Sequence, residues 1–133
     1  MNSEKKNALL DEDSRPVLLG VVHLRPLPAS PGYSRGGMGE IISAAKSDAE
    51  TLLEAGFDGY VIENFGDLPF FPTTVPPATV AALTRIACEL PTRDTIVIVN
   101  VLRNDPLAAL SIAAAAGLSG IRVNVHTSAM LCD

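Results

Sequence analysis

The chain has 133 residues, which is enough for one hydrophobic core and too few for two ordinary domains. It carries 10 basic and 15 acidic residues, a formal net charge of −5, and no stretch gathers Lys and Arg into a basic surface. Binding to a phosphate backbone needs such a surface, so we exclude nucleic acid as a partner.

The first predicted unit is a strand followed by a helix. Residues 1–15 are polar and of mixed charge, which predicts a flexible leader and not a secretory signal. Residues 17–22 form a continuous apolar run, which is typical of a strand buried on both faces. Residues 40–55 space their apolar side chains along one helical face, and Gly56 follows where a helix C-cap is expected.

The strand–helix cycle then repeats. The sequence predicts strands over 60–62, 95–102 and 121–125, and helices over 78–90 and from Asp105-Pro106 to 117. Strands that alternate with helices indicate a parallel sheet with right-handed crossovers.

An internal repeat supports a barrel. Residues 55–61 and 116–122 share the frame Ala-Gly-x-x-Gly-x-x, two strand–helix units apart. We expect the first Gly to close a helix and the second to allow a tight turn into a strand. No G-x-G-x-x-G follows the first strand, which disfavours a dinucleotide-binding fold. A (β/α)₈ barrel needs eight strands and usually about 250 residues, so residues 16–133 predict the N-terminal half of a TIM-like barrel, truncated after the fourth strand.

Polar residues collect where the predicted strands end, the end at which such barrels place their sites. In the fourth strand Arg122, Asn124 and His126 share one parity and should point into the barrel, with the apolar residues against the helices. Three polar side chains on an inward face are costly to bury without partners. The structural alternative is that these strand-end residues cap helices or form an internal hydrogen-bond network. It applies above all to Asn104, which precedes the third helix.

The candidate roles follow from side-chain chemistry. Histidine and glutamate are suited to general acid–base work, and Arg and Asn to holding an anion. We assign catalytic roles to His23, Glu63 and His126, and ligand binding to Asn64, Asn100, Arg103, Arg122 and Asn124. Glu63 with Asp67 and a histidine would be a weak metal set, since no H-x-H or H-E-x-x-H occurs, so we predict no metal and assign no cofactor.

The two cysteines, Cys88 and Cys132, match no zinc or redox spacing. Cys88 falls on an apolar helical stretch, which predicts a buried thiol. A reduced, cytoplasmic protein is therefore expected. No apolar run is long enough to span a bilayer, and peripheral contact with a membrane surface is left open.

At these strand ends the sequence resembles the BtpA/SgcQ family. The resemblance lies in four segments, residues 19–28 (LGVVHLRPLP), 63–70 (ENFGDLPF), 100–105 (NVLRND) and 121–130 (IRVNVHTSAM). It implies a TIM-barrel-like fold and, in cyanobacteria, a role in the accumulation of photosystem I as an extrinsic membrane-associated factor.

Two functional hypotheses follow. The first is a barrel that binds or converts a small anionic or phosphorylated metabolite, and the strand-end polar residues favour it. The second is a non-catalytic assembly factor for a membrane complex, as the resemblance implies. Both need the other half of a barrel, from a longer chain, a second copy or another half-barrel.

Overall fold

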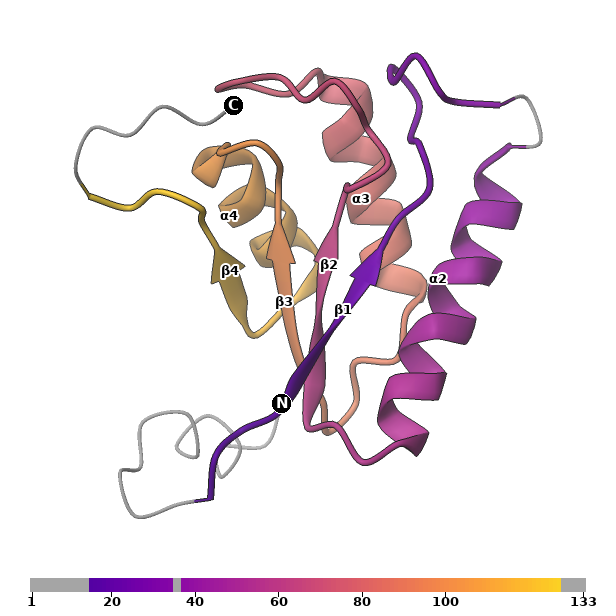
Figure 1. Cartoon of the computed structure of the whole chain (residues 1–133), viewed down its shortest axis with the longest axis vertical. Coiled ribbons are helices and arrows are strands. Elements are labelled where there is room, and N and C mark those ends of the chain that lie inside the picture. Colours follow the sequence, from indigo (N-terminus) through magenta and orange to yellow (C-terminus); the bar gives the residue numbers. More distant parts are fainter. Residues whose placement is uncertain (1–14, 35–36, 128–133) are drawn as a thin grey trace.

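The computed structural model describes residues 15–34 and 37–127, which form one sheet and three helices (Figure 1). In chain order the elements are β1 (Leu19–His23), α2 (Gly37–Glu54), β2 (Gly59–Glu63), α3 (Pro77–Glu89), β3 (Ile96–Asn100), α4 (Pro106–Ala116) and β4 (Gly120–Arg122). The predicted order of elements is confirmed. The predicted leader lies outside the described residues except for Arg15, whose guanidinium donates to both carboxylate oxygens of Asp58.

The four strands are parallel and stand in the order β1-β2-β3-β4, so each strand pairs with the next one along the chain. One helix connects each pair of neighbouring strands, and Figure 1 shows the carboxyl ends of all four strands at the same edge of the sheet. Sequential parallel strands joined by helices are the arrangement of a (β/α)₈ barrel over its first four strands. The predicted α/β fold class is confirmed.

The two faces of the sheet differ in what covers them. Val22, Ile62 and Val99 lie on one face, have no exposed surface and pack into the core with the helices. Val21 lies on the opposite face, where 41% of its surface is exposed. Because side chains alternate along a strand, the helices cover one face and the other corresponds to a barrel interior. We call the second one the inner face.

The repeated glycines have two different roles. Gly56 and Gly117 follow α2 and α4 with φ of 88° and 66°, the left-handed conformation that closes a helix, as predicted. Gly59 opens β2, and a Cβ there would lie 1.8 Å from the backbone oxygen of Ile96. Gly120 has open space around it. At Gly59 the second glycine of the repeat therefore permits close approach of β2 to β3. The tight turn predicted there does not explain the need for a glycine at this position.

Two further expectations from the sequence are wrong. β4 ends at Arg122 instead of 125, because the Asn104 side chain accepts from the backbone N–H groups of Asn124 and Val125 in place of a neighbouring strand. Asn104 is thus a loop hydrogen-bonder, and Asp105 caps α4 by accepting from Ala108 N–H.

Cys88 is exposed, because the helix buries Ala87 and turns the next position outward. Cys132 lies outside the described residues.

Candidate functional site

Four polar residues form one row across the carboxyl end of the sheet. The strand register pairs His23 with Glu63, Glu63 with Asn100, and Asn100 with Arg122. All four therefore stand at the same level of four adjacent strands, on the same inner face as Val21. The predicted parity of Arg122 is confirmed, and we refer to these four residues as the polar row.

Glu63 is the hub of the polar row. Its side chain is 7% exposed, and Oε1 accepts from Arg122 Nη1 at 2.9 Å and from Asn100 Nδ2 at 3.0 Å. Its second oxygen, Oε2, lies 3.4 Å from His23 Nε2. The side chains of His23 and Arg122 are 51% and 53% exposed. The row therefore has a buried carboxylate at its centre and half-exposed nitrogen groups at its two ends.

Asn100 is 1% exposed and joins the row to the segment after β4. Its Nδ2 also donates to Asn124 Oδ1 at 3.3 Å, and Asn124 Nδ2 donates to the backbone oxygen of Arg103 at 2.8 Å. Within the described residues the Asn100 Oδ1 atom has no hydrogen-bond partner. A buried acceptor without a partner is uncommon in a folded protein.

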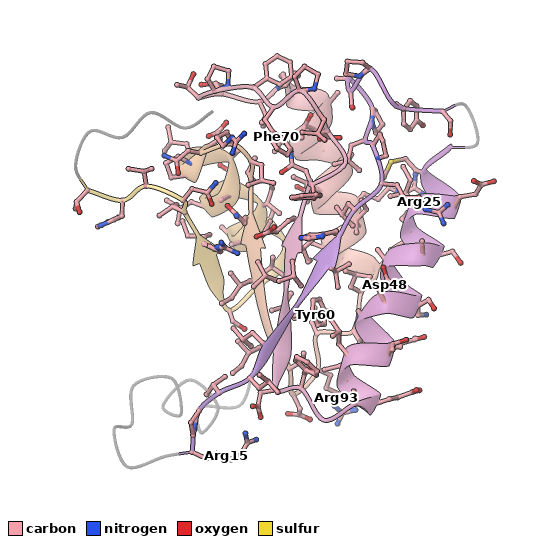
Figure 2. The ribbon with its side chains drawn as sticks, in the orientation of Figure 1. Arg15, Arg25, Asp48, Tyr60, Phe70 and Arg93 are labelled. Atoms are coloured by element: carbon pink, nitrogen blue, oxygen red, sulfur yellow. The ribbon has the colours of Figure 1, made fainter. Side chains whose placement is uncertain are left out.

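Aromatic side chains from the loop after β2 cover the His23 end of the row. The ring of Phe65 stacks on the imidazole of His23, with centroids 4.2 Å apart and planes 13° from parallel. Phe70 lies 6.2 Å from Phe65, and the Arg103 guanidinium carbon lies 5.0 Å above the Phe70 ring. Figure 2 shows Phe70 at the carboxyl end of the strands, with Arg15 and Arg93 at the opposite end. The contact between Arg103 and Phe70 places the Arg103 guanidinium against the loop after β2, beside the polar row.

Asn64 lies one residue beyond Glu63 and has a different environment. Its Oδ1 accepts from Leu102 N–H at 2.7 Å, and its Nδ2 donates to Asp67 Oδ2 at 3.1 Å. Asp67 Oδ1 in turn accepts from Leu27 N–H at 2.7 Å. Asn64 and Asp67 therefore tie the loops after β1, β2 and β3 to one another, and we call the pair the loop tie. Burial raises the pKa of the Asp67 carboxyl, against the lowering effect of these hydrogen bonds.

The structure brings together most of the predicted site residues. The contacts described above connect His23, Glu63, Asn100, Arg122, Asn124 and Arg103. Asn64 is 1% exposed and uses its amide within the fold. His126 is exposed, beyond the end of β4, and its catalytic role stays a prediction. Among the described residues no group of three or more His, Cys, Asp or Glu could hold a metal ion.

Sequence reasoning missed the side chains that support the site. Phe65 was not singled out, although it directly follows the polar pair Glu63-Asn64 at the end of β2. Asp105 accepts from the backbone N–H of Val75 at 2.9 Å as well as capping α4. Its position before Pro106 signals the cap, but nothing in the sequence signals Val75, which lies 30 residues away.

Fold and site together define a parallel α/β protein of the barrel type, with buried polar groups at the carboxyl ends of its strands. The chain belongs to the BtpA family, whose sequence pattern matches residues 14–133. None of the helices in the described part of the chain is long and apolar enough to cross a membrane.

Several curated relatives cover most of the chain. It is 47% identical over 125 residues to an uncharacterised protein of Pyrococcus furiosus, covering 93% of this chain and 47% of that protein. The photosystem I biogenesis protein BtpA of Synechocystis is 43% identical over 117 residues, covering 87% and 40% respectively. The sgc region protein SgcQ of Escherichia coli is 36% identical over 119 residues, covering 88% and 43%. The chain thus spans about half the length of the curated relatives it matches, and no solved structure shows a significant match.

Proposed function

We propose that the polar row binds a small anionic or phosphorylated metabolite. The observation that carries this proposal is the register, which sets His23, Glu63, Asn100 and Arg122 side by side at the carboxyl ends of four strands. Proteins with this barrel architecture use that end of the sheet for their sites. A network with only a structural role would not require exposed nitrogen groups at both of its ends.

The proposed roles follow from the contacts. Arg122 gives Nη1 to Glu63, and its half-exposed guanidinium can still meet a carboxylate or phosphate with two parallel hydrogen bonds. Arg103 and Asn124 extend the binding surface beside it. His23 and Glu63 form an acid–base pair, and any conversion of the ligand would use proton transfer between this pair and the ligand.

A binding measurement tests the role of Arg122. Inorganic phosphate titrated into the ¹⁵N-labelled chain, alone and mixed with the remaining half of the Pyrococcus furiosus relative, should shift the amide signals of residues near Arg122. Arg122→Gln should weaken the apparent affinity at least tenfold. Arg85→Gln is the matched control, because Arg85 is also a surface arginine paired with a glutamate, but it lies on α3. Equal affinity in the two variants would contradict the proposal.

We also propose that further strand–helix units complete the site, with residues 16–133 as one half of the barrel. The relatives support this, since they extend to about twice the matched length. The units could come from a longer chain, a second copy or another half-barrel. Mixing the chain with the remaining half of the Pyrococcus furiosus relative should yield a complex on size exclusion, and the absence of any complex would count against this arrangement.

A second candidate function is assembly of a membrane complex in a cytoplasmic, peripherally attached protein, which the name of the Synechocystis relative favours. It predicts that this chain, joined to the remaining half of that relative, restores photosystem I accumulation in cells that lack the relative. Glu63→Gln with Arg122→Gln in the same fusion separates the candidates. Restoration by the double variant would favour an assembly role independent of the polar row.

A further inference from the structure

We infer that the ligand of the polar row carries a hydroxyl group next to its anionic group, as a hydroxy acid or a sugar phosphate does. The inference rests on the proposed function and narrows its ligand class. It comes from a hydrogen-bond acceptor of the polar row, Asn100 Oδ1, that has no partner among the described residues.

The orientation of the Asn100 amide is fixed by its neighbours. Nδ2 lies 3.0 Å from Glu63 Oε1 and 3.3 Å from Asn124 Oδ1, both of them acceptors. Turning the amide over would place its oxygen against these two oxygens and lose both hydrogen bonds. The atom without a partner in the described residues is therefore the oxygen, Oδ1, an acceptor that needs a donor.

The missing hydrogen-bond donor to Asn100 Oδ1 limits the chemistry of the ligand. The oxygens of a carboxylate or of a fully ionised phosphate accept hydrogen bonds and cannot donate one, so a fully ionised anionic group cannot satisfy Asn100 Oδ1. Asn100 pairs in register with Arg122, which attracts the anionic group, and neighbouring strands lie about 4.8 Å apart. The donor and the anionic group must therefore be close together in the ligand. A neutral hydroxyl fits better than an ammonium group, which the Arg122 guanidinium would repel.

Access to Asn100 requires a movement, because its oxygen is closed to solvent in this structure. We assign this movement to Arg122, the register partner of Asn100, since its side chain is 53% exposed and, within the described residues, is held by one hydrogen bond to Glu63. An anionic group draws the guanidinium outward, and the adjacent hydroxyl then reaches the Asn100 oxygen. Binding thus exchanges part of an internal ion pair for contacts with the ligand.

Matched ligands test the inference on the unchanged chain. Lactate, propionate and alanine share a three-carbon carboxylate and differ only in a hydroxyl, a hydrogen or an ammonium group at C2. Glycerol 3-phosphate and n-propyl phosphate form a second pair that differs in hydroxyl groups. Titrations followed by amide shifts should give lactate and glycerol 3-phosphate about tenfold higher affinity than their hydroxyl-free partners, which corresponds to about 1.4 kcal/mol.

A variant locates the preference at Asn100. In Asn100→Ala, shown to be folded by circular dichroism, lactate and propionate should bind equally, and so should the two phosphates. Equal binding of the matched ligands by the unchanged chain would overturn the hydroxyl inference and leave the proposed function standing. Tighter binding of alanine than of lactate would also overturn it. No binding of any of the five compounds, either by the chain alone or by its complex with the remaining half of the Pyrococcus furiosus relative, would contradict the proposed function itself.

Discussion

Two sets of buried polar side chains meet at the end of β2, one on the inner face of the sheet and one in the loops beyond it. In the loops, Asn64 and Asp67 of the loop tie bond to backbone groups of Leu27 and Leu102 and to each other. On the inner face, Glu63 and Asn100 of the polar row bond to side chains. Within the described residues the row leaves one buried acceptor without a partner.

The difference separates a structural network from a candidate site. A buried polar group that is fully bonded to backbone holds loops in place and has nothing left for a ligand. A buried group with an unused hydrogen-bond acceptor, beside half-exposed side chains such as His23 and Arg122, is suited to a ligand that supplies the missing donor. The buried members of each set are one carboxylic acid and one asparagine, so the completeness of their hydrogen bonding is what distinguishes them.

The largest expected effect is on the stability and association of the isolated chain, and it comes from the inner face and the edges of the sheet. In the described residues the outer edges of β1 and β4 pair with no strand, and Val21 on this face is 41% exposed. Open strand edges and exposed apolar surface promote association. We therefore expect the isolated chain to be poorly stable or oligomeric, measured by sedimentation velocity and thermal unfolding. A monomer that melts cooperatively would contradict this.

Breaking the loop tie should cause the next largest loss of stability. Asn64→Ala removes the acceptor of Leu102 N–H and a donor to the buried Asp67 carboxylate, which leaves buried groups unpaired. We expect a loss of about 3 kcal/mol in the free energy of unfolding, measured with denaturant.

Glu63→Gln is the matched comparison from the polar row, because Glu63 and Asn64 are sequence neighbours and both are buried. It keeps an acceptor for Asn100, and Arg122 is half exposed, so the expected loss is about 1 kcal/mol or less. A larger loss for Glu63→Gln than for Asn64→Ala would reverse our assignment of the two sets.

The two faces themselves can be compared with neighbouring valines. Val22→Ala removes a fully buried side chain from the core beneath the helices and should cost about 2 kcal/mol. Val21→Ala acts on the inner face, where the side chain is partly exposed, and should cost less than about 0.5 kcal/mol. Denaturant midpoints of both variants measure the difference. Equal losses would mean that another part of the protein, or a second copy, covers the inner face in solution.

Much of the fold could be predicted from the sequence, because its signals are local. Apolar runs, helical spacing and the glycines at 56 and 117 placed most element ends within a few residues of their positions in the structure. β4 was predicted too long, because its alternation continues past Arg122 while the pairing with β3 stops there. A strand needs a partner as well as a pattern.

The site could be predicted only in part. Side chains at the ends of parallel strands converge on one edge, so the candidates for the polar row could be named from the sequence. Their contacts could not, since Glu63 and Arg122 are 59 residues apart and their pairing depends on strand register. The loop tie was missed for the same reason. Asp67 finds its backbone partner at Leu27, 40 residues earlier, so Asn64 looked like a ligand-binding residue.

The smallest expected effect is the pH dependence that the loop tie contributes. Burial raises the pKa of Asp67 above its ordinary value, so the folded chain holds this proton more tightly than the unfolded chain. Its contribution to stability is then present at acidic pH, below the unfolded pKa, and is lost as the pH rises through the raised folded pKa. For one group the slope cannot exceed about 1.4 kcal/mol per pH unit.

Asp67→Asn removes this titration while keeping an acceptor for Leu27 N–H. The difference in unfolding free energy between the unchanged chain and the variant, measured across acidic pH, should therefore fall as the pH rises. The opposite slope would mean that the hydrogen bonds from Leu27 and Asn64 outweigh burial and favour the ionised carboxylate. In that case the loop tie would hold a charge, and the completeness of its hydrogen bonding alone would distinguish it from the polar row.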